Sequence, residues 1–95
     1  MDYSKETLQK IQQLAQELTP ISEISFLLDC DEVQLTDDVR TPGSAVRKAY
    51  MTGYAKAAHE IRMRNMDLSK AGSPAADEAL RGYLKKMMND LWSYR

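Results

Sequence analysis

The side chains that most often carry catalysis or hold a metal ion are scarce in this sequence. It contains one histidine, His59, and one cysteine, Cys30. His59 precedes Glu60, but adjacent residues of a helix do not face each other, and no further histidine or cysteine could complete a zinc site. Asp29 and Asp31 flank Cys30, and their charges raise the pKa of its thiol, which makes it a poor nucleophile. The four glycines are isolated and form no phosphate-binding loop. The sequence therefore predicts a protein that is not an enzyme and that uses no metal or cofactor.

Charge divides the chain into two parts. Residues 1–39 carry two basic and nine acidic side chains, a net charge of −7, whereas residues 40–95 carry eleven basic and five acidic side chains, a net charge of +6. Two interpretations stay open: the parts attract each other, within one chain or between chains, or the basic part binds a nucleic-acid backbone. The single cysteine permits no intrachain disulfide and favours a cytoplasmic location. No run of about 18 apolar residues is present, so no membrane partner is expected.

The longest helical pattern, Ser44 to Ala71, organises the second part of the chain. Ser44 is the expected N-cap and Gly72 the left-handed residue that ends the helix. A short link then leads into a last helix from Pro74 to about Trp92, which must return antiparallel. We predict a helical hairpin over residues 44–95.

Three shorter helices are expected before this hairpin, over Ser4 to Leu18, Pro20 to Leu28 and Asp31 to about Val39. Thr19 is the expected cap of the second helix, with Pro20 as its first residue. The fold class is therefore all-α: an N-terminal three-helix, helix-turn-helix-like unit over residues 1–43, followed by the long antiparallel hairpin, in one compact domain overall. The side chains expected to face inward from the short helices are Leu8, Ile11, Leu14, Ala15, Leu18, Ile21, Ile24, Leu27, Leu28, Val33, Leu35 and Val39; those of the last helix are Ala76, Leu80, Tyr83, Leu84, Met87 and Leu91.

The second and third helices have the layout of a helix-turn-helix, which places a DNA-reading role on the third. Four carboxylates within Asp31–Arg40 oppose such a role, because they would face a polyanion. A plain three-helix packing unit is the alternative. The candidate DNA-binding residues are Gln34, Thr36, Arg40, Arg47, Lys48, Arg62 and Arg64.

The hairpin carries more apolar surface than two helices can cover, which indicates a homo-oligomer. Small residues four apart would form a notch for another helix, the hairpin has a surplus of Tyr and Met side chains, and Met51 and Met66 fall off the main stripe. Methionine that only fills the back of a small core is the alternative. The predicted oligomer-interface residues are Ala49, Gly53, Tyr54, Ala57, Ile61, Leu84, Met88 and Trp92.

Three segments resemble small phage or prophage proteins of the terminase small-subunit type: Pro20–Leu28 (PISEISFLL), Ala45–Tyr54 (AVRKAYMTGY) and Lys70–Ala76 (KAGSPAA). The resemblance implies a helix-turn-helix that engages double-stranded DNA at a packaging site. It also implies a hairpin that assembles subunits into a ring, and a protein partner in the phage motor. The acidic third helix departs from the family pattern. The opposing interpretation is a protein–protein adaptor whose acidic N-terminal unit binds a basic partner and no DNA.

Overall fold

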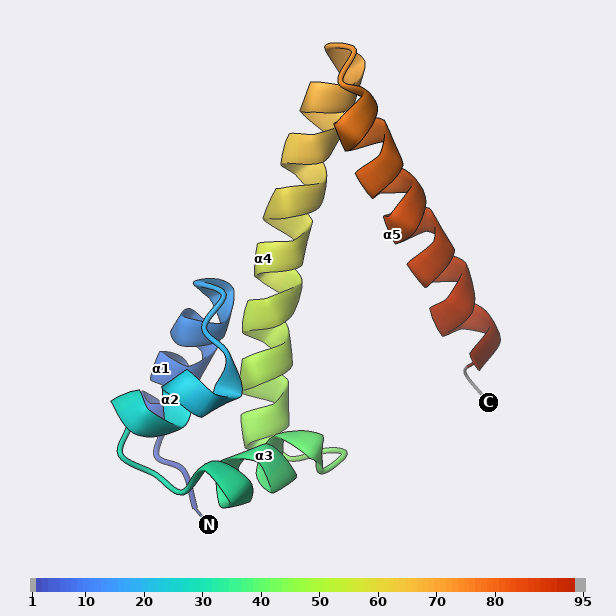
Figure 1. Ribbon diagram of the computed structural model, residues 1–95. Coiled ribbons are helices and arrows are strands. Elements are labelled where there is room, and N and C mark those ends of the chain that lie inside the picture. The colour runs from blue at the N-terminus through green and yellow to red at the C-terminus, as the bar shows by residue number, and fades with distance from the viewer. Residues whose placement is uncertain (1, 94–95) are drawn as a thin grey trace. The chain divides into compact units, whose positions relative to one another are not determined.

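The chain is all-α, as the sequence predicts. In the computed structural model, which describes residues 2–93, it forms five helices and no strand within that range (Figure 1). They are α1 (Lys5–Gln16), α2 (Ile21–Leu27), α3 (Glu32–Arg40), α4 (Ala45–Lys70) and α5 (Pro74–Ser93). The chain divides into two compact units, an N-terminal unit, Met1–Ala58, and a C-terminal unit, His59–Arg95. Their boundary lies inside α4, whereas the sequence placed a boundary between residues 43 and 44.

Side-chain caps begin four of the five helices in the described part of the chain. The side chains of Ser4, Asp31, Ser44 and Ser73 each accept a hydrogen bond from the backbone N–H three residues on, at 2.9–3.3 Å. Gly72 has a φ of 96°, the left-handed conformation expected after α4. The exception is α2, where Pro20 occupies the cap position without a side-chain hydrogen bond, so the helix begins one residue later than predicted. The carbonyl of Pro20 accepts from the N–H groups of Glu23 and Ile24 instead.

Four fully buried side chains form the centre of the N-terminal unit, one from each helix that reaches it. They are Ile11 of α1, Ile24 of α2, Leu35 of α3 and Val46 of α4. Each lies on the predicted inward stripe of its helix, because residues three, four or seven apart share one helix face. This core fixes α2 and α3 against the other two helices.

The close approach of α1 to α4 depends on Gly53. A Cβ atom at this position would lie 2.2 Å from the carbonyl oxygen of Gln12 and 2.9 Å from the Cβ of Ala15. The two helix backbones therefore touch at a point where no side chain fits, and α1 lies alongside the first half of α4 (Figure 1). Ala49 and Ala57 are buried on the same face. The predicted small-residue notch thus receives α1 of the same chain.

Three inward predictions for the short helices are wrong, because Leu18, Leu27 and Val33 are each about two-thirds exposed. Leu18 follows the end of α1 and has a φ of 66°, which turns it out of the helical stripe. Leu27 ends the seven-residue α2, whose buried face runs through Ile24 and Ser25. Val33 lies two residues before Leu35, about 200° around the helix, so both cannot face the core.

The C-terminal unit is a hairpin formed by the last part of α4 and by α5. Ser69 donates a hydrogen bond to Asp77, the guanidinium of Arg62 lies 5.3 Å from the ring centroid of Tyr83, and Ala76 is buried. Its α4 segment has 12 residues and α5 has 20, or about 18 Å against about 30 Å. The α4 segment of this unit is therefore too short to cover all of α5. Leu84, Met87 and Leu91 were expected to face inward and are instead 61–65% exposed.

Across residues 2–93, none of the helices combines the length and the hydropathy that crossing a lipid bilayer requires.

Candidate nucleic-acid interface

A groove between α1 and the first turns of α4 gathers hydrogen-bond donors from both helices. Lys5, Gln9 and Gln12 follow one another at i, i+4 and i+7 on α1, and Lys48 and Thr52 at i and i+4 on α4, so each helix presents one row. Lysine, glutamine and threonine side chains all donate to phosphate oxygens. Leu8, Ala45 and Ala49 complete the lining, which contains no carboxylate.

The side chains that line this groove carry two positive charges and no negative one. Lys48 lies in the first turn of α4, which contains no acidic residue, and residues 40–58 carry four basic side chains and no acidic one. A cation at a helix N-terminus opposes the helix dipole, so Lys48 does not serve helix stability there. Lys5 stands in the first turn of α1, and both lysines are exposed. Their charges add to the partial positive charges of the two helix starts and favour an anion.

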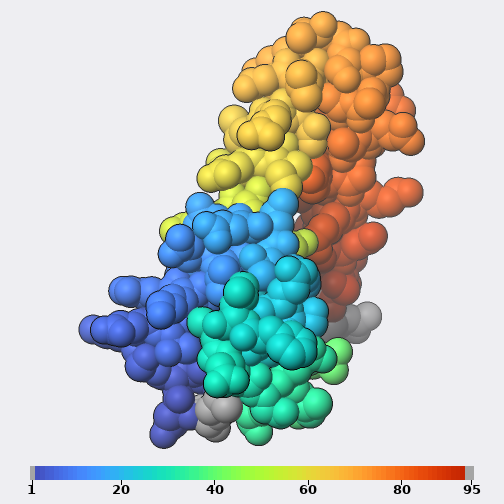
Figure 2. Space-filling model, turned by 60° about the vertical axis from the view of Figure 1, so that its left-hand side comes forward, coloured from blue at the N-terminus to red at the C-terminus, as the bar shows by residue number. Residues whose placement is uncertain are grey.

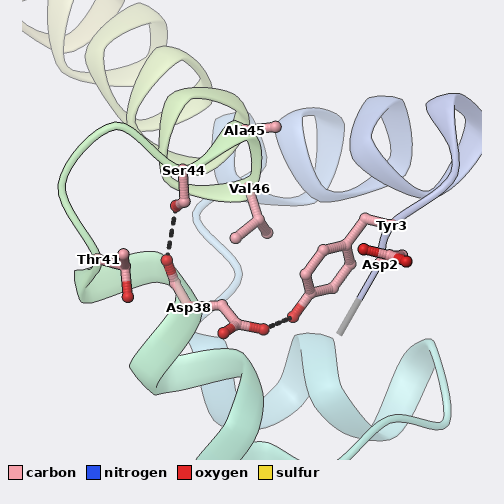
Figure 3. Close-up of a pocket in the computed structure, with 7 residues that line it drawn as sticks. All are labelled: Asp2, Tyr3, Asp38, Thr41, Ser44, Ala45 and Val46. Carbon is pink, nitrogen blue, oxygen red and sulfur yellow. Dashed lines mark hydrogen bonds between the residues drawn. The ribbon is translucent and has the colours of Figure 1, made fainter.

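Hydrogen bonds at the α3–α4 corner hold the start of α4 in place (Figure 3). The hydroxyl of Ser44 donates to the carbonyl oxygen of Asp38 at 2.7 Å and accepts from the N–H of Arg47 at 3.1 Å. The guanidinium of Arg47 donates to the carbonyl oxygen of Val39 at 3.0 Å, and the Thr41 hydroxyl donates to that of Asp37 at 2.8 Å. Arg47, a predicted DNA-binding residue, thus satisfies a carbonyl at the end of α3.

Tyr3 ties the chain before α1 to α3. Its hydroxyl donates to Asp38 at 2.6 Å, as Figure 3 shows, and the side-chain amide of Gln34 donates to the other carboxylate oxygen at 2.9 Å. The hydrogen bond from Tyr3, together with that from Gln34, lowers the pKa of Asp38. Burial, followed by the hydrogen bond to Asp38, raises the pKa of the Tyr3 phenol. The pair is stable with the phenol neutral and the carboxylate charged.

Tyr3→Phe should therefore lower the melting temperature of the protein at neutral pH. A carboxyl group whose pKa is lowered in the folded state stabilises that state above its unfolded pKa of about 3.9, and this contribution disappears as pH falls through the folded pKa. The difference between wild type and variant should shrink as the pH falls below the unfolded pKa and through the lower folded pKa of Asp38, as measured by circular dichroism. Tyr54→Phe, on the exposed side of α4, is the control. An equal difference at neutral and at low pH would contradict the role of Asp38.

The other predicted DNA-binding residues do not gather at one place. Gln34 is engaged with Asp38, Thr36 is half-buried, and Arg40 is exposed on α3. Arg62 and Arg64 belong to the C-terminal unit, where Arg62 stacks on Tyr83 and Arg64 is exposed. Only Lys48 lies in the groove. Its neighbours Lys5, Gln9, Gln12 and Thr52 were missed, although the spacing of the first three along one helix face was a readable signal.

No protein-family model, curated protein or solved structure matches the chain.

The surface of α2 and α3 has the opposite character to the groove. Residues 11–39 contain seven carboxylates and no lysine or arginine. Within the described part of the chain the one ion pair joins Lys86 to Asp90, so no ion pair neutralises a carboxylate of α2 or α3. In Figure 2 these two helices are the cyan to green region in the lower part of the view. The outward face of α3 would therefore repel the DNA backbone.

Neither Cys30 nor His59 lines the groove. Burial, followed by the charges of Asp29 and Asp31, raises the pKa of Cys30, the direction that the sequence predicts. His59 is exposed on α4. Between residues 2 and 93 no cluster of three or more potential ligands could hold a metal ion.

Proposed function

We propose that the protein is a non-enzymatic, DNA-associated protein of the terminase small-subunit type, and that it holds the phosphate backbone in the α1–α4 groove. The observation that carries this proposal is the convergence of Lys5 and Lys48 on a groove lined by further donors and by no carboxylate. The resemblance in the sequence supplies the association with DNA. Because α3 is acidic and the groove is lined by no carboxylate, we place the DNA contact in the groove and not on α3.

Binding through such a groove should be independent of base sequence. Lysine and amide groups that reach only phosphates fix position and carry no base readout. Non-specific contacts of this kind give a Kd of about 1–100 µM at physiological salt. A cytoplasmic location, a homo-oligomer and a partner in a packaging motor belong to the same proposal, the last through the resemblance alone.

Fluorescence anisotropy on two labelled duplexes of unrelated sequence tests this function. Both should bind with the same affinity, and binding should weaken by an order of magnitude or more between about 50 and 200 mM salt, because lysines release counterions from DNA. The absence of binding at the lower salt would reject the proposal. A strong preference for one duplex would show base reading, which the groove does not offer.

A second candidate is the protein–protein adaptor. It is favoured by Phe26, Leu27 and Val33, which are 84%, 65% and 67% exposed on the acidic helices α2 and α3. Exposed apolar side chains on helices that carry uncompensated carboxylates suit a basic, amphipathic partner. Neutralising acidic residues of α2 and α3 would weaken binding to such a partner, whereas it would strengthen binding to DNA.

A further inference from the structure

Two exposed apolar surfaces of this chain are chemically complementary. The first, the α2–α3 patch, consists of Phe26, Leu27 and Val33, on two helices that pack against each other. Phe26 is 84% exposed, which leaves a whole phenyl ring in water. Five carboxylates of α2, α3 and the link between them are exposed as well: those of Glu23, Asp29, Asp31, Glu32 and Asp37.

The second surface, the α5 stripe, runs along the end of the last helix. Its side chains recur at i, i+3, i+4, i+7 and i+8, so they share one helix face. Each is 51–74% exposed, and Trp92 is the most exposed of them. The stripe consists of Leu84, Met87, Met88, Leu91 and Trp92.

Charge indicates whether the α5 stripe would bind a second α5 stripe or the α2–α3 patch. Residues 81–93 contain three basic side chains, Arg81, Lys85 and Lys86, and one acidic one, Asp90. Residues 20–39 contain six acidic side chains and no basic one. Two α5 stripes carry the same net charge and repel each other over distance, whereas the α2–α3 patch attracts the stripe. The acidic patch is thus the better partner for the basic stripe.

We propose that α5 of one copy docks its apolar stripe on the α2–α3 patch of a second copy. Each surface is exposed within its own unit, and we place their contact between two chains. Phe26 and Trp92 are the aromatic anchors, and a buried aromatic side chain removes about 150–250 Å² from water. The proposal uses neither Lys5 nor Lys48, so it stands or fails separately from DNA binding.

This contact joins two different surfaces and has consequences for assembly. Each copy offers one patch and one stripe, so association continues head to tail until a ring closes or a filament grows. A contact of a surface with its own copy would stop at the dimer. The size of the assembly therefore distinguishes stripe-to-patch association from the pairing of two identical surfaces.

Trp92 is the only tryptophan, so its fluorescence reports the docking directly. In full-length protein, emission should shift to shorter wavelength from micromolar to submillimolar concentration, as light scattering shows the mass rise. Phe26→Ser should weaken association by about thirtyfold, the loss expected for an anchor that contributes about 2 kcal/mol. Because Phe26 is exposed, the variant should keep its helicity by circular dichroism. Met63→Ser, an exposed apolar residue outside both surfaces, should leave association unchanged.

Mixing two defective variants gives the decisive result. Phe26→Ser lacks a patch, and the double variant Met87→Ser, Leu91→Ser lacks a stripe, so each alone should remain monomeric. Mixed, they should form a one-to-one dimer that grows no further. If the Phe26→Ser variant alone associates as tightly as wild type, the stripe pairs with itself and the proposal is wrong. A wild type that stays monomeric at every concentration would also overturn it, whether or not Trp92 is buried within its own chain.

Discussion

Replacing Gly53 by alanine should lower the free energy of unfolding of the N-terminal unit by about 1–3 kcal/mol, the usual cost of overpacking. The new methyl group would stand 2.2 Å from the carbonyl oxygen of Gln12, and that atom is backbone, which cannot rotate away. Alanine favours a helix over glycine by about 0.5–1 kcal/mol, which offsets only part of this cost. The measurement is urea denaturation followed by circular dichroism.

Gly82→Ala is the matched control, because Gly82 also lies inside a helix. A Cβ there meets no atom within 4 Å, so the variant should gain the propensity of alanine without a clash. The two substitutions should therefore act in opposite directions. If Gly53→Ala proved as harmless as Gly82→Ala, α1 and α4 could not be in backbone contact.

Truncating Ile24 to alanine should destabilise the N-terminal unit by about 2–5 kcal/mol. Ile24 has no exposed surface and contacts the core that four helices share, so its removal leaves a cavity. Leu27→Ala, one turn later on α2, removes a side chain that is 65% exposed and should cost less than about 0.5 kcal/mol.

The comparison of these two positions is made in the same denaturation experiment. Both side chains fit the inward stripe that the sequence predicts, and the structure separates them. Equal losses at Ile24 and Leu27 would show that α2 is rotated or extended relative to the described helix.

Capping chemistry explains why the helix starts could be predicted. Ser4, Asp31, Ser44 and Ser73 act through the backbone N–H three residues on, so the information lies within one turn of sequence. The same holds for Gly72, where only the left-handed conformation matters. Local sequence was sufficient for these elements.

Burial depends on distant parts of the chain, and there local patterns failed. Both Val33 and Leu35 were expected to face the core, but only the face of α3 that carries Leu35 is buried. The notch around Gly53 was predicted to receive a helix of another copy, and α1 of the same chain occupies it instead. The packing of the whole core decides which helix fills a notch. The spacing of apolar residues along one helix predicts which face is buried, but it does not identify the helix that packs there.

The candidate site shows the same limit. Lys48 and its neighbour Arg47 are both predicted DNA-binding residues, because both are basic side chains of the long helix. The structure separates them, because Arg47 donates to the carbonyl of Val39 while Lys48 faces α1 across the groove. Lys5 and Lys48 are 43 positions apart in the sequence, so only the packing of α1 on α4 could bring them together.

The salt dependence of DNA binding by the double variant Lys5→Gln, Lys48→Gln tests the proposed function most directly. Each lysine that neutralises a phosphate contributes about 0.9 to the slope of log affinity against log salt concentration, so the slope should flatten by up to about 2. The control Arg64→Gln, Lys70→Gln removes the same charge from exposed positions of the C-terminal unit and should leave the slope nearly unchanged. We expect the groove variant alone to lose the slope. If the control lost as much, or if the groove variant bound DNA like wild type, the groove would not be the DNA-binding site.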